Sequence, residues 1–165
     1  MRILIAHNRY KQAGGEDTVF ASETSLLRDA GYDVRNIEIS NDLIGSQIGR
    51  VGAALAATYS RRGVALVTDA IAAFRPNILH VHNFFPLLSP AIFAAARRQG
   101  VATVLTLHNF RLACPQGTLF RDGAHCDLCV GRIPWRAVRH GCYQGSTSGS
   151  VAVAASLVAH RALGT

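Results

Sequence analysis

The sequence predicts an α/β protein in which a parallel sheet carries helices on both faces. Short apolar runs rich in β-branched residues alternate with amphipathic segments of ten or more residues between positions 2 and 109. Strands separated by segments of that length are joined by right-handed crossovers, which make the sheet parallel. The length of 165 residues and the hydrophobic content of 49% fit a single domain. The fold class is therefore a doubly wound, Rossmann-like sheet.

A β-α-β unit opens the chain. Residues 2–7, RILIAH, form a short apolar run typical of a buried strand. A glycine-containing loop leads to residues 16–31, whose apolar residues suit one helix face and whose last residue, Gly31, suits a helix end. Residues 32–39 then predict a second strand, with Ile37 and Ile39 in alternating positions.

Two further strands follow in the middle of the chain. Ser60 is a good N-cap for a helix that Pro76 terminates, and residues 77–83, NILHVHN, predict the third strand. Residues 91–100 predict a helix ending on a glycine. Residues 101–109, VATVLTLHN, are almost continuously apolar, so we expect a fourth strand buried on both faces.

Three segments lie outside this alternation. Residues 48–59 predict an additional helix, and residues 146–164 predict a helix near the end of the chain. Between them, residues 110–145 lack clear periodicity and contain all four cysteines, which indicates a Cys-rich loop insertion after the fourth strand.

We expect a cytoplasmic protein. The N-terminal apolar run turns polar at His7 without a cleavage site, unlike a secretory signal. The longest apolar stretch, residues 151–160, is short and interrupted by Ser156, so no spanning segment is expected. Together with the basic loop before it, this stretch suits peripheral contact with the inner face of a membrane, or simply a packed helix.

Seventeen basic residues against ten acidic ones give a formal net charge of +7, and Lys11 is the single lysine. Arginine reads phosphate in a bidentate manner, so phosphate-bearing ligands, anionic lipids and nucleic acids all remain open. A solvated basic surface is an equally good interpretation of the charge. Charge alone therefore selects no partner.

Three predicted strands end in the same dipeptide. The pairs are His7-Asn8, His82-Asn83 and His108-Asn109. A lone buried histidine is more often structural than functional, but ligands of open parallel sheets bind at the carboxyl ends of the strands. Three such pairs at one edge predict a polar crevice for a hydroxyl-rich ligand. His80 shares a face with His82 and fits a structural role.

A glycine pair, Gly14-Gly15, follows the first strand. It permits close approach of a phosphate or hydroxyl to the backbone at a helix N-terminus. It also fits a simple turn in which Glu16 and Asp17 complement the helix dipole. The sequence lacks both the G-x-G-x-x-G fingerprint after the first strand and the G-x-x-x-x-G-K-[ST] motif, which counts against classical dinucleotide enzymes and P-loop nucleoside triphosphatases.

Residues 1–34 and 74–115 resemble the N-terminal domain of family 4 retaining glycosyltransferases, which have two domains in the GT-B architecture. The resemblance covers nearly the whole chain, and its specific parts are the Gly-Gly loop, the R-P-N-I-L-H-V-H strand and T-L-H-N followed by L-x-C-P. It implies that this domain holds a saccharide or lipid-linked acceptor. A C-terminal domain, missing from this chain, would hold the nucleotide-sugar donor, so the chain alone is expected to be inactive.

The resemblance also implies roles for individual residues. Gly14 and Gly15 would approach the donor phosphate and the acceptor. His108 would contact the donor sugar near the reacting carbon, and His82 with Asn83 would line the acceptor side. Retention is usually explained by attack on the same face, with the leaving phosphate taking the acceptor proton, so no dedicated protein base is expected.

The four cysteines follow the spacing C-x11-C-x2-C-x12-C. The set is Cys114, Cys126, Cys129 and Cys142. Clustered cysteines in a cytoplasmic protein favour a structural zinc site with four thiolate ligands, with an iron–sulfur cluster or free thiols as alternatives and His125 and His140 as substitute ligands. Such a site would hold a loop that shapes the acceptor pocket.

Two other functions compete with the transferase interpretation. A zinc-containing nucleic-acid-binding module would require a second C-x-x-C pair, which the sequence lacks, so no nucleic acid is expected. A non-catalytic sugar- or nucleotide-binding domain remains open.

Overall fold

The computed structural model describes residues 1–12, 14–45 and 49–163. The chain forms two compact units, which we call the first unit (Met1–His108) and the second unit (Asn109–Thr165).

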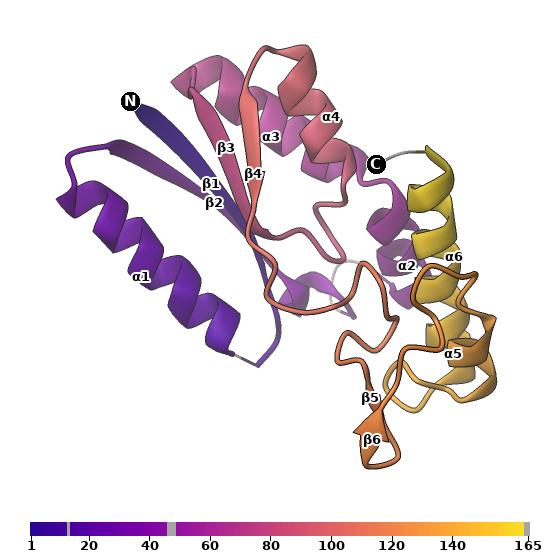
Figure 1. Cartoon of the computed structure of the whole chain (residues 1–165). Coiled ribbons are helices and arrows are strands. Elements are labelled where there is room, and N and C mark those ends of the chain that lie inside the picture. The colour runs from indigo at the N-terminus through magenta and orange to yellow at the C-terminus, as the bar shows by residue number, and fades with distance from the viewer. Residues whose placement is uncertain (13, 46–48, 164–165) are drawn as a thin grey trace. The chain divides into compact units, whose positions relative to one another are not determined.

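A four-stranded parallel sheet forms the centre of the first unit (Figure 1). Its strands are β1 (Arg2–Arg9), β2 (Asp33–Ser40), β3 (Ile78–Asn83) and β4 (Ala102–Leu105). They are ordered β2-β1-β3-β4, and every neighbouring pair runs parallel. The predicted fold class is confirmed.

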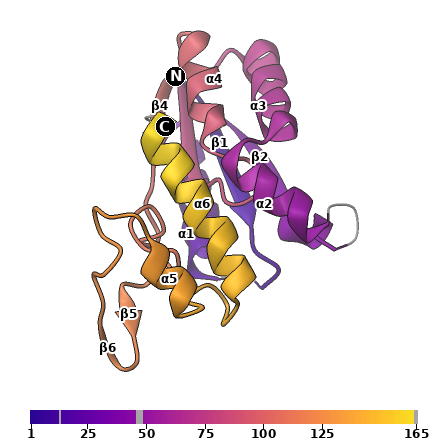
Figure 2. The same ribbon diagram turned by 90° about the vertical axis from the view of Figure 1, so that its right-hand side faces the viewer.

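Helices cover both faces of this sheet. The helices of the first unit are α1 (Gly15–Asp29), α2 (Arg50–Thr58), α3 (Arg61–Phe74) and α4 (Ala91–Arg98), with a 3-10 turn at Asn41–Leu43. Figure 1 shows α1 on one side of the sheet and α3 and α4 on the other, and Figure 2 looks onto the side that carries α2, α3 and α4. The predicted helix over 48–59 is confirmed as α2, although residue 48 lies outside the described residues.

The two faces bury very different amounts of apolar surface. The larger core joins Leu79 and Val81 of β3 to buried residues of α2, α3 and α4. The smaller core contains Ile3, Ile5, Phe20 and Val34, beneath α1. Since side chains alternate along a strand, the even-numbered residues of β3 face the smaller core, and this places its two histidines beneath α1.

The predicted helix boundaries of α3 are confirmed. The Ser60 hydroxyl accepts a hydrogen bond from the backbone N–H of Gly63 at 2.9 Å, which is an N-cap bond. The helix ends at Arg75, which adopts a left-handed conformation with φ of 49° directly before Pro76.

The fourth strand is shorter and more exposed than predicted. β4 spans four residues in place of the expected nine, and its residues alternate between exposed and partly buried, with Val104 46% exposed. β4 lies at the edge of the sheet and pairs with β3 alone, so it lacks the second strand that would shield it. The expectation of a strand buried on both faces was therefore wrong.

The second unit contains a hairpin and two helices. The hairpin joins β5 (Phe120–Arg121) to β6 (Ala124–His125), and the helices are α5 (Trp135–Arg139) and α6 (Thr147–Leu163). α6 confirms the helix predicted over 146–164, of which residue 164 lies outside the described residues.

The hairpin and α5 were missed in the segment predicted to be irregular. Asp122 and Gly123 form the hairpin loop with φ of 53° and 81°, as a type I′ turn requires. An Asp-Gly pair of this kind is a recognised hairpin signal in a sequence.

α6 packs against α5 and buries Val153, Ala154 and Leu157. This packing agrees with the interpretation of the apolar stretch over residues 151–160 as a packed helix. None of the helices in the described ranges combines the length and apolar character needed to cross a bilayer.

Candidate functional site

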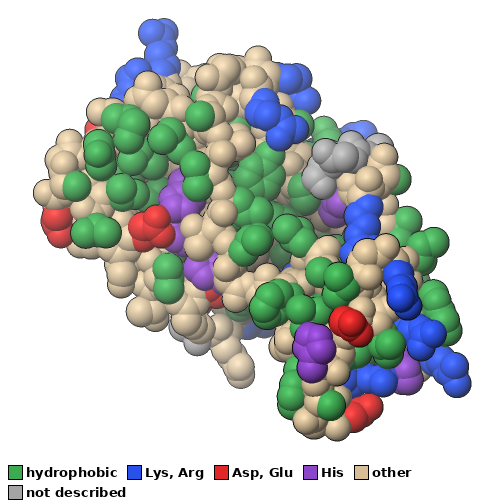
Figure 3. All heavy atoms as spheres, viewed as in Figure 1, with side chains coloured by type: hydrophobic (Ala, Val, Ile, Leu, Met, Phe, Trp, Pro, Cys, Tyr) green, Lys and Arg blue, Asp and Glu red, His purple; other side chains and the backbone are tan. Residues whose placement is uncertain are grey.

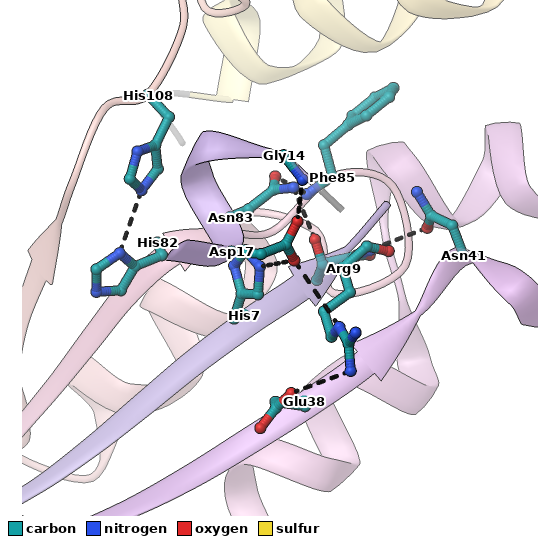
Figure 4. A network of polar contacts seen from close by, with 11 residues as sticks. His7, Arg9, Gly14, Asp17, Glu38, Asn41, His82, Asn83, Phe85 and His108 are labelled. Atoms are coloured by element: carbon teal, nitrogen blue, oxygen red, sulfur yellow. Dashed lines mark hydrogen bonds and ion pairs between the residues drawn. The ribbon is translucent and has the colours of Figure 1, made fainter. Parts of the chain in front are cut away.

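The candidate site lies at the carboxyl edge of the sheet, where β1 and β3 end near the start of α1 (Figure 4). His7 and Asn8 belong to the last part of β1, and His82 and Asn83 end β3. All four side chains are buried. Polar side chains at this edge are where a ligand of an open parallel sheet binds.

Two asparagines of the first unit, Asn8 and Asn83, hold the strand ends together. The Asn8 side chain donates to Asn41 Oδ1 at 2.9 Å and accepts from the Leu87 backbone N–H at 2.8 Å. The Asn83 side chain donates to the Asn8 carbonyl at 2.8 Å and accepts from the Phe85 N–H at 3.0 Å. Because these polar atoms are occupied inside the chain, Asn8 and Asn83 act as a scaffold for the edge.

Three histidines predicted from the strand ends converge, with a fourth beside them. His82 Nδ1 lies 3.1 Å from His108 Nε2, and the two rings stack with centroids 5.3 Å apart. His7 lies edge-on to His82 at 6.4 Å between centroids and stacks on Phe20 at 4.7 Å. His80 lies 4.5 Å from His82 by the same measure. The predicted convergence of His7, His82 and His108 is found, within one unit.

Burial keeps three of these imidazoles, those of His80, His82 and His108, neutral. Burial, together with the neighbouring histidines His80, His108 and His7, lowers the pKa of His82 to about 4. Burial also lowers the pKa of His108, and it lowers the pKa of His80 despite the opposing effect of the Glu23 carboxylate. A neutral imidazole has one donor and one acceptor nitrogen, which suits hydrogen bonding to hydroxyl groups.

Asp17 ties the glycine loop to β1. Its Oδ2 accepts from the Gly14 N–H at 2.7 Å, and its Oδ1 lies 3.0 Å from His7 Nε2 and 3.8 Å from Arg9 Nε. The sequence related Asp17 only to the helix dipole, but its position three residues after the N-cap Gly14 is the one that a capping box uses.

The glycines of this loop are not required by the packing of the chain. Gly14 has φ of −129° and ψ of −176°, an extended conformation open to any residue. A Cβ at Gly14 or Gly15 would meet no atom within 4 Å, whereas a Cβ at Gly63 would lie 2.5 Å from the Leu88 carbonyl oxygen. The open space before the loop is therefore free for a ligand to approach the backbone.

A groove lies along α1 and β2. Its volume is about 430 Å³, and its lining includes Arg9, Asp17, Phe20 and Arg28. Small-molecule sites have volumes of this order, ~300–1,000 Å³. The groove therefore offers space for a ligand beside α1 and β2, although Gly14 and Gly15 are not among its lining residues.

Glu23 is a residue of this region that the sequence analysis missed. It lies on α1 with its side chain 33% exposed, and its two oxygens approach His80 Nδ1 at 3.5 Å and His82 Nε2 at 3.4 Å. Phe20 and Leu27 mark the buried face of α1, and Glu23 lies between them at helical spacing. A charged residue on an apolar helix face was the signal by which the sequence could have indicated Glu23.

Asn109 lies outside this cluster. It begins the second unit, where its side-chain oxygen accepts from the Arg111 backbone N–H at 3.0 Å and stabilises a local turn. The structure gives it no role together with the other two asparagines.

The four cysteines share one region of the second unit as free thiols. Burial raises the pKa of Cys129 and of Cys142, and their fellow cysteines raise both values further. In the described residues, however, no three of the four sulfurs lie within 4.8 Å of one another. Four-thiolate zinc binding would therefore require the loops to draw the sulfurs closer. The two substitute ligands, His125 and His140, are exposed.

No family model, curated protein or solved structure matches the chain.

Asp17 makes the stability of the first unit depend on pH. Burial alone would raise its pKa, but the Gly14 N–H, His7 and Arg9 outweigh burial and lower the pKa. A lowered pKa in the folded state gives stability that is complete above the unfolded-state value and is lost as the pH falls through the folded one. We expect Asp17→Asn to lower the free energy of unfolding at pH 7 by on the order of 1 kcal/mol, with the difference shrinking under acid conditions.

Urea unfolding at neutral and acid pH measures this difference. Asp33→Asn, which alters an exposed carboxylate at the start of β2, is the control. A difference for Asp17→Asn that stays constant down to the lowest pH would contradict the assignment.

Proposed function

We propose that this chain is the acceptor-binding half of a retaining glycosyltransferase, of the family 4 type that its sequence resembles. The reaction would transfer a sugar from a nucleotide-sugar to a saccharide or lipid-linked acceptor. The observation that supports this most is the convergence of the His7, His82 and His108 side chains near the glycine loop at one edge of the sheet.

His108 is our candidate for contact with the donor sugar. It engages His82 through Nε2, which leaves Nδ1 as the nitrogen available to a ligand. A neutral imidazole held by a second imidazole is suited to orient a sugar hydroxyl near the reacting carbon. His82 is then a positioning residue, since it acts through His108.

The glycine loop is our candidate for contact with the donor phosphate. The N-terminus of α1 carries the partial positive charge of its helix dipole, and a Cβ at Gly14 or Gly15 would meet no atom of the described residues within 4 Å apart from its chain neighbours. Phosphate oxygens can therefore approach the backbone closely.

The proton of the acceptor needs a destination other than Asp17. Both oxygens of that carboxylate already contact groups of the loop and of β1. In the same-face attack that the family resemblance implies, the bond to the leaving phosphate breaks, the acceptor oxygen bonds to the sugar carbon, and the phosphate takes the acceptor proton.

A non-catalytic sugar- or nucleotide-binding domain is the second candidate. The same neutral imidazoles and engaged carboxylate would bind a polar ligand without any reaction. The two candidates differ in turnover, since both predict ligand binding at this edge.

The role of His108 is tested by His108→Ala in this chain joined to a nucleotide-sugar-binding domain. We expect kcat/KM for sugar transfer to fall by at least about tenfold, because a contact made near the reacting carbon is lost. His160→Ala, on α6, is the control. Binding of nucleotide-sugars without any turnover would favour the binding-domain candidate, and unchanged turnover would remove His108 from the site.

The glycine loop is tested by a matched pair of substitutions. Gly14 and Gly49 are both N-cap residues with extended backbones and open space where a Cβ would be. We expect each change to alanine to cost at most about 1 kcal/mol of stability. Only Gly14→Ala should weaken nucleotide-sugar binding, measured by calorimetry. Equal binding by both variants would show that the loop does not receive the ligand.

We also propose a structural zinc ion on the four cysteines, with the loops closing around it. Each thiolate that binds the ion loses its proton, despite the raised pKa of Cys129 and Cys142. Protein purified without chelator should contain zinc that Cys129→Ser releases, as measured by elemental analysis. Zinc content that is equal in the two proteins would contradict this site.

A further inference from the structure

A cluster of possible metal-binding side chains in the first unit lies between α1 and β3. One ligating atom from each of Glu23, His80 and His82 lies within 4.8 Å of the other two, and this is the one such group among the described residues. We propose that these three residues bind a divalent transition-metal ion of the zinc type through two imidazole nitrogens and the Glu23 carboxylate.

The distances fit a bridging ion better than direct hydrogen bonds. Glu23 Oε1 lies 3.5 Å from His80 Nδ1, and Glu23 Oε2 lies 3.4 Å from His82 Nε2. Direct N–H···O bonds are shorter, about 2.7–3.2 Å. Ligands bound to zinc at ~2.0–2.2 Å in a tetrahedral arrangement are separated by about 3.4 Å.

In each histidine, the nitrogen that does not face Glu23 has a hydrogen-bond partner of its own. His80 Nε2 lies 2.8 Å from Thr106 Oγ1, and His82 Nδ1 lies 3.1 Å from His108 Nε2. A metal-binding imidazole typically uses its outer N–H in such a bond, which fixes the ring and directs the other lone pair at the ion. Thr106 and His108 therefore occupy the positions of supporting residues.

The His82 nitrogen that faces Glu23, Nε2, lacks a hydrogen-bond partner. The His82 side chain is fully buried. A buried polar atom without a partner costs about 1–3 kcal/mol. An ion between His82 and Glu23 would satisfy this nitrogen.

The site is also accessible and selective. Glu23 is 33% exposed, while the two histidines are at most 7% exposed, so an ion could enter past the carboxylate and keep a position open to solvent. Figure 3 shows histidine side chains at the surface beside an acidic one. Imidazole ligands favour zinc, copper, nickel or iron over magnesium and calcium.

The test must separate this site from the cysteines. The full chain, with its thiols alkylated and its metals removed by chelation, is titrated with cobalt(II), whose visible absorption reports the ligand set. We expect saturation at one ion per chain, with d–d bands and no thiolate charge-transfer band. Glu23→Gln and His80→Gln should each weaken binding by at least about tenfold, since each removes a ligand.

Glu38→Gln is the matched control, because it removes an equal charge from an exposed carboxylate on β2 and should leave binding unchanged. Absence of cobalt binding by folded protein, or equal binding by Glu23→Gln, would overturn the proposal.

A measurement on the unsubstituted chain removes any dependence on how the variants fold. Histidine ¹⁵N spectra recorded with zinc on the alkylated protein should show coordination shifts at His80 Nδ1 and His82 Nε2. Shifts confined to histidines of the second unit would overturn the proposal. The inference does not rest on the proposed transferase function, because metal binding is measured without any sugar.

Discussion

The hydrogen bonds of Asn8 hold the carboxyl edge of the sheet in one arrangement. This side chain is fully buried in β1, and it contacts the 3-10 turn after β2 through Asn41 and the loop after β3 through Leu87. Its own carbonyl receives the side chain of Asn83. A buried amide cannot leave these bonds unmade without a cost of about 1–3 kcal/mol for each group, so the three strand ends are tied to one another.

Because of these hydrogen bonds, the asparagine and the histidine in each His-Asn pair of β1 and β3 have different roles. The asparagines use their polar atoms within the chain, whereas the histidines beside them lie on the α1 face of the sheet with nitrogens still available, such as His82 Nε2. Burial beneath α1 lowers the pKa of His82 and keeps its ring neutral. A rigid edge with adaptable hydrogen-bonding groups is suited to a polar ligand.

Much of this arrangement could be predicted from the sequence, because strand periodicity and the strand-end rule are local signals. They gave the parallel sheet and the meeting of His7, His82 and His108. The scaffold role of Asn8 could not be predicted, since its partner Leu87 lies 79 residues away in a loop. The exposure of β4 depends on strand order, which apolar content does not encode.

Charged residues were harder to place than apolar ones. Glu23 lies one turn from Phe20 on the buried face of α1, and a pattern that counts only apolar positions passes over it. Its significance appears once β3 is known to lie beneath α1, because only then do His80 and His82 face it.

The transferase proposal and the metal site of Glu23, His80 and His82 both involve His82. Its Nδ1 contacts His108, and its Nε2 faces Glu23. If Nε2 binds an ion, Nδ1 carries the proton and donates to His108 Nε2, so the neutral His108 ring presents an N–H at Nδ1. If Nε2 instead carries the proton and faces Glu23, Nδ1 accepts from His108 Nε2, and His108 presents a lone pair at Nδ1. Metal binding under α1 would therefore decide whether His108 donates a hydrogen bond to a sugar hydroxyl or accepts one from it. A neutral imidazole pair transmits this choice without any movement of the backbone.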